Sequence, residues 1–393
     1  MTTLRVLLHV AAQRDYELHS LDFSTAFLQG SLHEEIWLRR PPGFTGSFPP
    51  GTQWSLRRPV YGLRQAPREW NDTLRTTLAA LGFAPSTADP SLFLRTDTSL
   101  PPFYILVYVD DLVFATTDTA GLAHVKSELQ KRHTCTDLGE LRSYLAQVVT
   151  VITVSGSAAA CAPTSYRRSS TATRLCRCPV VIFLVWVLGV HIRSYTARHR
   201  PEHMAAAKRV LCYLCSTSGM GLVLGGRRPV VLTGHADASW ADDQATQRSS
   251  QGYTFSLGSG SVSWRSTRSS SVLSSSCEAE IYAGAMAAQE LRWLTYLLSD
   301  LGESPRSPPV LYVDNKAMLA LCREHRLEHR TKHIALRYFL ARELQQRGQL
   351  RLAYVASEAN TADIFTKAFA PGDHQRFCTM LGLVPTWPHL LTS

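Results

Sequence analysis

The alternation of hydrophobic and polar positions is clearest between residues 102 and 117, where two apolar runs flank a pair of aspartates. The first run, residues 103–109, is rich in Val, Ile, Phe and Tyr. Runs this short with this composition are typical of strands rather than helices. Asp110 and Asp111 suit the tight turn between the two runs. The pattern therefore predicts a β-hairpin that carries two adjacent carboxylates at its tip.

This hairpin tip has two interpretations that the local sequence leaves open. Aspartate is a common turn residue, so the pair can be purely structural. Two neighbouring carboxylates also repel each other, and a divalent cation that prefers oxygen ligands would stabilise them. A third acid, Asp22, ends an alternating segment upstream. Its presence at another predicted strand end favours half of a metal site.

The rest of the first 145 residues follows a consistent periodicity. Residues 1–20 predict a helix followed by a strand, and Ser24 or Thr25 is expected to cap the short helix that comes next. Further helices are expected over residues 70–81 and 119–133. These local signals agree with one another, as they do in a domain that folds.

The periodicity is lost between residues 146 and 194, which combine β-rich, small-residue and Arg/Ser-rich pieces. The apolar part of this segment, residues 180–190, is shorter than the roughly 20 residues that a membrane-spanning helix needs. A buried strand would explain that part of the pattern. We expect the segment as a whole to be poorly ordered.

A regular pattern returns in the C-terminal part, which predicts three strands, a helix, a strand, a helix, a strand and a helix. Four acids lie at or near the ends of these elements. Asp237 and Asp314 end predicted strands, Glu280 lies in the first turns of the long helix, and Asp363 lies at the start of the last helix. Acids at strand ends are usually ordinary surface residues. In this order of elements, however, the four can converge at one end of a sheet, where they could not all stay ionised without cations.

Composition narrows the class of protein. The chain has 393 residues, is 45% hydrophobic and carries a formal charge of +10, a balance that suits packed domains in contact with a polyanion such as nucleic acid. Nine cysteines in so long a chain indicate a reducing compartment rather than a disulfide framework. Cys212 and Cys215 have zinc-like spacing, but they lie on a helical pattern without a second pair, which disfavours a metal site there. No secretory signal is evident at the N-terminus.

Nine sequence blocks together resemble a known family. LD…AFLQG, YGLRQAPREW, YVDD and DLGEL, in that order, are similar to the reverse transcriptase of copia-type retrotransposons. HADASWADD, SSCEAEIYA, LYVDNKAM, RTKHIALRYFLARE and EANTADIFTK are similar to the ribonuclease H of the same elements. The resemblance implies an α+β and α/β protein, with a partial reverse transcriptase palm of antiparallel sheet and helices followed by a ribonuclease H-like mixed sheet with helices.

The resemblance also implies a domain organisation. It covers about residues 1–145 and 197–383, and the segment between them is expected to be a frame-shifted or mis-joined piece of the element. The expected parts are a truncated palm and fingers domain, an aberrant linker, a connecting helix and strand, a ribonuclease H-like domain and a tail, over residues 1–145, 146–196, 197–225, 226–383 and 384–393. Because the family's polymerase begins upstream of Met1, polymerase activity is expected to be impaired.

By resemblance, each half of the chain has a metal-binding catalytic set. The polymerase set is Asp22, Asp110 and Asp111. The ribonuclease set is Asp237, Glu280, Asp314 and Asp363, with Glu278 as the alternative to Glu280. The family positions that contact nucleotide and template correspond to Phe27, Gly62, Arg64, Gln65 and Pro67. His333 could orient substrate or water, although a surface or packing role is the more common one for a histidine.

The implied cofactors are two Mg²⁺ ions per site, about 4 Å apart, with Mn²⁺ as a substitute. The implied partners are an RNA template, a DNA primer, an RNA–DNA hybrid and deoxynucleoside triphosphates, with no membrane. The expected location is the cytoplasm, within a virus-like particle in an intact element, or the nucleus. The competing hypothesis is a decayed or repurposed protein that binds nucleic acid through its basic surface without turnover.

Overall fold

The computed structural model describes most of the chain, namely residues 1–39, 49, 52–144, 147–153, 172–177, 200–217, 219–225, 230–323 and 340–385. Its internal contacts divide the chain into a first unit, Tyr16–Leu141, and a second unit, Met1–Asp15 with Arg142–Ser393. The sequence prediction had assigned residues 1–15 to the same domain as the hairpin. Among the described helices, none combines the length and the apolar character that crossing a bilayer requires.

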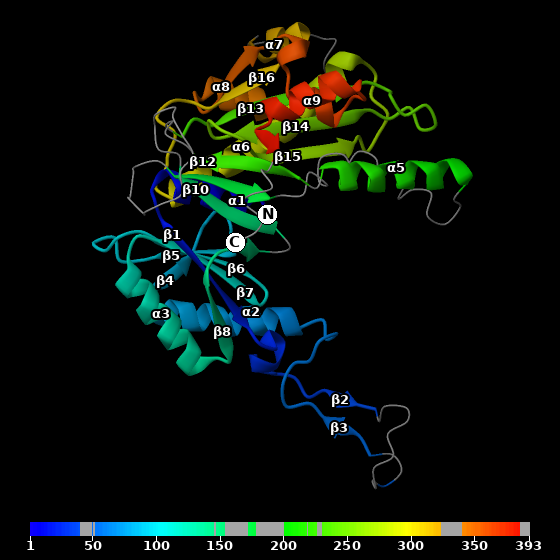
Figure 1. The fold of residues 1–393 in the computed structure, drawn as a ribbon. Coiled ribbons are helices and arrows are strands. Elements are labelled where there is room, and N and C mark those ends of the chain that lie inside the picture. The colour runs from blue at the N-terminus through cyan, green and yellow to red at the C-terminus, as the bar shows by residue number, and fades with distance from the viewer. Residues whose placement is uncertain are drawn as a thin grey trace. The chain divides into compact units, whose positions relative to one another are not determined.

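The first unit is built on a six-stranded antiparallel sheet with the strand order β4-β5-β6-β7-β1-β8 (Figure 1). The strands are β1 (Glu17–Phe23), β4 (Phe83–Pro85), β5 (Leu92–Arg95), β6 (Phe103–Tyr108), β7 (Asp111–Thr116) and β8 (Cys135–Glu140). The other elements are η1 (Ala26–Gln29), β2 (Trp37–Leu38), β3 (Trp54–Ser55), α2 (Ala66–Ala80) and α3 (Thr119–Arg132). The predicted hairpin is therefore present as β6 and β7, in the middle of the sheet.

Apolar side chains of α2 and α3 complete the core of this unit. Trp70, Leu74 and Leu78 recur every four residues along α2, are buried, and join one hydrophobic cluster with the sheet. The helix begins earlier than the predicted residue 70, because Pro67 lies in its first turn, where a missing N–H costs nothing. The predicted side-chain cap of η1 is wrong: Thr25 stands at the N-cap but makes no capping hydrogen bond.

The second unit contains the mixed sheet that the C-terminal pattern predicts, with the strand order β15-β14-β13-β16-β17. β13, β14 and β15 pair in antiparallel fashion, whereas β13, β16 and β17 are parallel. The strands are β13 (Thr233–Ser239), β14 (Ser250–Ser256), β15 (Ser261–Arg268), β16 (Val310–Val313) and β17 (Arg351–Tyr354). Its helical elements are α6 (Ser276–Asp300), α7 (Lys316–Arg323), α8 (Leu340–Gln346), η5 (Ser357–Ala359), η6 (Asp363–Phe365) and α9 (Pro371–Met380). This confirms the expected α+β class.

A second sheet of this unit has the order β18-β12-β11-β10-β9. Its strands are β9 (Ser143–Tyr144), β10 (Gln147–Thr153), β11 (Ala172–Arg177), β12 (Met220–Gly225) and β18 (Leu383–Pro385), and the unit also includes α1 (Thr2–Gln13) and α5 (Pro201–Thr217). β10 and β11 pair within the segment that was expected to be poorly ordered. Residues 146, 154–171 and 178–194 of that segment lie outside the described residues.

Helix α1 is buried on most of its surface and is fixed to this unit by polar contacts. The Arg5 guanidinium lies 3.7 Å from the ring centre of Trp264, and its Nη1 donates to the carbonyl of Val262 at 2.7 Å. His9 is fully buried, and its Nδ1 accepts a hydrogen bond from the backbone N–H of Gly225 at 3.1 Å. These contacts explain why residues 1–15 group with the second unit.

Gly252 on β14 allows the turn η6 to lie directly on the sheet. It pairs with Asp237 in the β13–β14 ladder. A Cβ atom at Gly252 would lie 2.6 Å from the Cβ of Phe365 and 3.1 Å from the Cγ2 of Thr366, closer than side chains normally approach. The absence of a side chain at Gly252 thus sets how closely Asp363, the first residue of η6, can approach the sheet.

The substitution Gly252→Ala is expected to destabilise the protein by about 1–3 kcal/mol, because the added methyl group overpacks the contact with η6. The measurement is the free energy of unfolding from urea titration. Gly372→Ala is the matched control, since a Cβ there meets no atom within 4 Å. Equal stability of the two variants would show that η6 does not depend on this close approach.

Candidate active site

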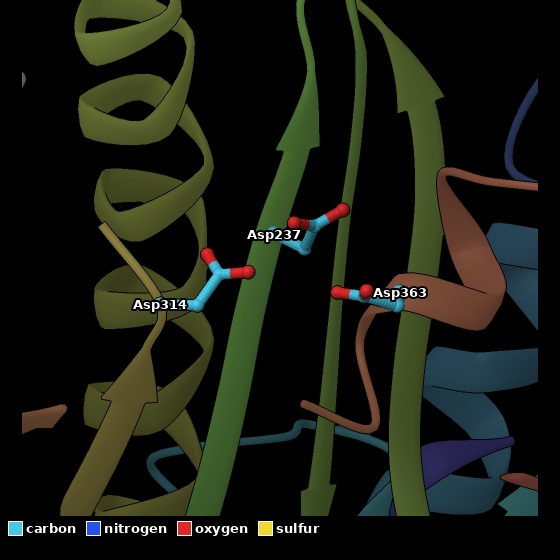
Figure 2. Close-up of side chains that lie close together, drawn as sticks. All are labelled: Asp237, Asp314 and Asp363. Atoms are coloured by element: carbon cyan, nitrogen blue, oxygen red, sulfur yellow. The ribbon is translucent and has the colours of Figure 1, made fainter. Parts of the chain in front are cut away.

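Three aspartates of the second unit come together at one end of its mixed sheet. Asp237 lies near the end of β13, Asp314 directly follows β16, and Asp363 begins η6. Each offers a carboxylate oxygen, and these oxygens lie within 4.8 Å of one another. Figure 2 shows the carboxylates of Asp314 and Asp363 directed toward Asp237 from either side. The side chains of Asp237 and Asp363 are only 1% and 5% exposed, whereas Asp314 is partly open to water.

The sheet topology explains two of these positions. β13 and β16 are adjacent and parallel, so their carboxyl ends meet at the same edge of the sheet and bring Asp237 and Asp314 together. The third position depends on the loop that precedes η6. The fully buried Asn360 donates from Nδ2 to the carbonyl of Ala236 at 3.1 Å, which ties this loop to β13.

Two further contacts hold the turn and the cluster in place. Ser266 on β15 donates a 2.7 Å hydrogen bond to the carbonyl of Phe365. Ser357 in η5 donates a 2.8 Å hydrogen bond to Oδ2 of Asp314. The three carboxylates are therefore fixed by contacts from several different elements, and their proximity does not depend on one flexible loop.

Glu280 borders this cluster from helix α6. It is 7% exposed, and its Oε2 has no hydrogen-bond partner among the described residues. Burial, followed by the charges of Asp237 and Asp314, raises the pKa of Glu280 to about 9. The structure thus places Glu280 near the aspartates, although it does not belong to the set whose oxygens lie within 4.8 Å.

Glu278, the alternative to Glu280, has a different role in the structure. Its backbone N–H donates to Oγ of the N-cap residue Ser275 at 3.1 Å, and its Oε2 accepts from both the backbone N–H and the Oγ of Ser274. These are helix-capping contacts. The geometry therefore favours Glu280 as the fourth acid of the cluster.

A lysine and a threonine from the turn after Asp363 contact the buried aspartates. Nζ of Lys367 lies 2.9 Å from Oδ2 of Asp363 and 3.2 Å from Oδ1 of Asp237. Thr366 donates its hydroxyl hydrogen to Oδ2 of Asp237. Burial and the charge of Asp237 raise the pKa of Asp363 to about 7, even though the Lys367 ammonium lowers it. The two carboxylates raise the pKa of Lys367 above its ordinary value, so this ammonium stays charged.

The donor atoms of this cluster fit a hard divalent cation. All are carboxylate oxygens, which Mg²⁺ prefers as protein ligands. Oδ1 of Asp363 and Oε2 of Glu280 are buried, and neither has a hydrogen-bond partner in the described part of the chain. A buried oxygen without a partner is costly unless a cation or a proton satisfies it.

The first unit brings its three predicted acids to one place as well. Asp22 on β1 pairs with Asp111 on β7 in the antiparallel ladder, and the carbonyl of Asp110 accepts a 2.8 Å hydrogen bond from the N–H of Phe23. Burial, and then the charges of Asp110 and Asp22, raise the pKa of Asp111. Among the described residues, the carboxylate oxygens of these three acids do not all lie within 4.8 Å of one another. They are therefore less closely grouped than the three aspartates of the second unit.

The tip of the hairpin is held in an unusual backbone conformation. Val109 has a φ angle of +56°, a region that β-branched residues rarely adopt. Nε1 of the buried Trp70 donates a 2.6 Å hydrogen bond to the carbonyl of Val109. The indole of α2 therefore stabilises the turn that presents Asp110 and Asp111.

The remaining predicted residues of the first unit lie in η1, in the turn before α2 and at the start of α2. The ring of Phe27 lies 4.5 Å from the ring of the exposed Tyr61. Gly62 has a φ of +100° in the turn before α2, and Arg64 is exposed. Gln65 is the N-cap of α2 and donates to Glu34 at 3.3 Å, whereas Pro67 occupies the first turn.

Sequence reasoning missed several residues that organise the two clusters. Asn360, Ser357 and Lys367 belong to this group in the second unit, and Trp70 belongs to it in the first. A signal existed for Lys367, which follows Asp363 by four residues, the spacing of an ion pair on one helical turn. His333 lies outside the described residues. Cys212 and Cys215 are exposed on α5.

Comparison with known proteins identifies relatives of the whole chain. Residues 1–161 match a family described as reverse transcriptase (RNA-dependent DNA polymerase), so this match runs past residue 145, where the resemblance was predicted to break. A retrovirus-related Pol polyprotein from transposon RE2 of Arabidopsis thaliana is 33% identical in an alignment of 427 residues, gaps included, that covers 98% of this chain. The Pol polyprotein from transposon TNT 1-94 of Nicotiana tabacum is 28% identical over 93% of this chain. The chain spans 29% and 31% of the lengths of these two relatives.

Solved structures with similarity to the chain include a foamy viral protease-reverse transcriptase in complex with an RNA/DNA hybrid. It has a TM-score of 0.44 and 13% identity over 87% of this chain and 44% of that chain. The N-terminal RNase H domain of a Mycobacterium tuberculosis protein covers 38% of this chain and 98% of its own, with a TM-score of 0.26 and 13% identity. The sequence relatives carry the comparison: over nearly its whole length the chain is similar to retrovirus-related Pol polyproteins of transposons, and its residues 1–161 match the reverse transcriptase family.

Proposed function

We propose that the second unit cleaves the RNA strand of RNA–DNA hybrids by metal-assisted hydrolysis. The observation that carries this proposal is the convergence of Asp237, Asp314 and Asp363, whose carboxylate oxygens lie within 4.8 Å of one another. The order of parallel and antiparallel strands around them supports the assignment of a ribonuclease H-like sheet. The net charge of +10 suits binding to a polyanionic duplex.

The residues of the cluster have distinct parts in this proposal. Asp237, Asp314, Asp363 and Glu280 would hold two Mg²⁺ ions. Bound ions would lower the pKa of a water molecule and neutralise charge on the scissile phosphate. Thr366 and Ser357 orient the carboxylates of Asp237 and Asp314 through hydrogen bonds. Glu280 holds a proton at neutral pH when no cation balances its neighbours, because burial and their charges favour its neutral form.

The first unit supports a second function, the extension of a DNA primer on an RNA template. The observation that favours it is the ladder register that sets Asp22 opposite Asp111 at the hairpin tip. In this proposal Asp22 and Asp110 would hold two Mg²⁺ ions, with Asp111 as the third acid. Phe27 would favour deoxynucleoside triphosphates by excluding a ribose 2′-hydroxyl, and Gly62, Arg64, Gln65 and Pro67 would lie near nucleotide and template.

The alternative to both enzyme functions is nucleic-acid binding without turnover. The basic charge of the chain is compatible with this alternative, because charge alone supports non-specific binding to a phosphate backbone. The cluster of buried acids is harder to reconcile with it, since negative side chains repel a phosphate unless cations lie between them. Cleavage assays therefore separate the two possibilities.

Asp314→Asn is expected to reduce Mg²⁺-dependent cleavage of a labelled RNA–DNA hybrid on the order of a thousandfold, because metal-ion catalysis supplies several kcal/mol of transition-state stabilisation. Glu278→Gln is the control and should retain most of the activity, since Glu278 caps α6 rather than facing the cluster. Hybrid binding should persist in both variants. Binding without any cleavage by the unaltered chain would favour the non-catalytic alternative.

The pH dependence of stability tests the buried state of Glu280. Its pKa is raised from 4.5 to about 9, so in this interval the folded protein holds a proton that the unfolded chain releases. Stability is therefore lost as the pH rises toward 9. Asp363, with a pKa of about 7, adds the same trend at lower pH. Burial lowers the pKa values of His9 and His235 from 6.5 to about 4. These two histidines therefore oppose the loss of stability, but only below pH 6.5.

In the presence of a chelator, the free energy of unfolding is expected to fall by about 1–2 kcal/mol between pH 7 and pH 9. Glu280→Gln should remove most of this decrease, because the amide does not ionise. Urea denaturation at both pH values measures the effect, with Glu278→Gln as the control. Parallel pH profiles for the unaltered chain and Glu280→Gln would mean that Glu280 is not held in this buried, acid-rich environment.

For the polymerase site, any incorporation of a deoxynucleotide onto a DNA primer paired with poly(rA) is expected to be lost in Asp110→Asn. The substitution removes a negative charge at the hairpin tip while it keeps the side-chain shape. The exposed Asp72 on α2 provides the control substitution Asp72→Asn. Incorporation that is insensitive to Asp110→Asn would contradict the assignment of this hairpin.

A further inference from the structure

Lys367 is the basic side chain that contacts two of the buried acids directly. Its Nζ lies 2.9 Å from Oδ2 of Asp363 and 3.2 Å from Oδ1 of Asp237. The side chains of these aspartates are 5% and 1% exposed, whereas that of Lys367 is 36% exposed. The ammonium thus reaches from the protein surface to two carboxylates that water barely reaches.

The backbone after Asp363 explains how Lys367 reaches this position. The N–H of Lys367 donates to the carbonyl of Asp363 at 2.9 Å, which closes a single helical turn. Residues four apart on such a turn lie on the same side, so Lys367 and Asp363 both face Asp237. Thr366 from the same turn donates its hydroxyl to Asp237. One short segment therefore supplies an acid, a hydroxyl and a cation to the cluster.

The contacts of Lys367 are distributed unevenly over the three aspartates. It pairs with Asp237 and Asp363, whereas Asp314 accepts a hydrogen bond from the neutral hydroxyl of Ser357. Among the described residues, Lys367 makes no hydrogen bond to Asp314 or Glu280, the two acids on the other side of Asp237 from the lysine's partner Asp363.

We propose that Lys367 is a resident counter-ion, which holds Asp237 and Asp363 together in the metal-free protein and which a divalent cation must displace to bind between them. This inference rests on the proposed metal site of the second unit. A displacement is feasible because the partly exposed lysine can move into solvent on its flexible stem without unfolding the turn. A cation held by both Asp237 and Asp363 would therefore require Lys367 to leave these two carboxylates.

The proposal distinguishes Lys367 from a catalytic residue and from a purely structural one. A structural lysine would stabilise the fold without any effect on the affinity for metal ions. A resident counter-ion stabilises the metal-free protein and weakens metal binding, because the incoming cation must break two charge-assisted hydrogen bonds. These two effects have opposite signs, and both can be measured without an activity assay.

The experiment compares the full chain with Lys367→Met, which removes the charge and keeps a long side chain. Lys367→Arg retains the charge and should resemble the unaltered chain in stability. Lys208→Met, at an exposed position of α5, is the control for the loss of a lysine elsewhere. Titration calorimetry with MgCl₂ alone measures the ion affinity, and thermal unfolding in a chelator measures the stability of the metal-free protein.

In the chelator, Lys367→Met is expected to unfold at a lower temperature than both the unaltered chain and Lys208→Met. In the titration, Lys367→Met should bind Mg²⁺ about tenfold more tightly, as expected when two charge-assisted hydrogen bonds no longer have to be broken. Unchanged or weaker Mg²⁺ affinity of Lys367→Met would overturn the counter-ion proposal and leave the nuclease assignment intact. Absence of Mg²⁺ binding in every variant would overturn both, whereas tighter binding without hybrid cleavage would overturn the nuclease assignment alone.

Discussion

Mutual repulsion among carboxylates gathered in a poorly hydrated place is the constraint on which the second unit depends. Asp237, Asp314 and Asp363 present their oxygens within 4.8 Å of one another, with Glu280 beside them. Such a group is stable only if protons, an ammonium or metal cations offset the charge. The structure contains two of these solutions, a raised pKa at Glu280 and the ion pairs of Lys367, and its donor set suits the third.

The surrounding fold holds the acids together against this repulsion. Parallel pairing of β13 and β16 fixes Asp237 and Asp314, and the buried amide of Asn360 ties the third acid's loop to β13. Because Gly252 has no side chain, η6 can lie directly on the sheet. Carboxylates also lie near one another in the first unit, although less closely. There, Trp70 stabilises the hairpin turn that carries Asp110 and Asp111. In both units, neutral hydrogen bonds to backbone carbonyls position charged side chains.

The sequence predicted the parts of the structure that depend on local periodicity. Alternation along residues 102–117 gave the hairpin, and the order of elements after residue 229 gave the mixed sheet and the proximity of Asp237 and Asp314. It did not give the roles of Asn360 and Lys367, because these depend on how one loop packs on a distant strand. The same limit applies to α1, whose amphipathic pattern predicted a helix but not the second unit as its partner.

The most direct test of the account is the location of bound metal ions. A crystal of the protein grown with Mn²⁺ and measured at the manganese absorption edge would show each ion as an anomalous-scattering peak. The account predicts peaks in contact with the carboxylates of Asp237, Asp314 and Asp363, with the Lys367 ammonium moved away from Asp237 where the ion lies between Asp237 and Asp363. An ordered cluster that stays free of manganese while Lys367 keeps both ion pairs would contradict it.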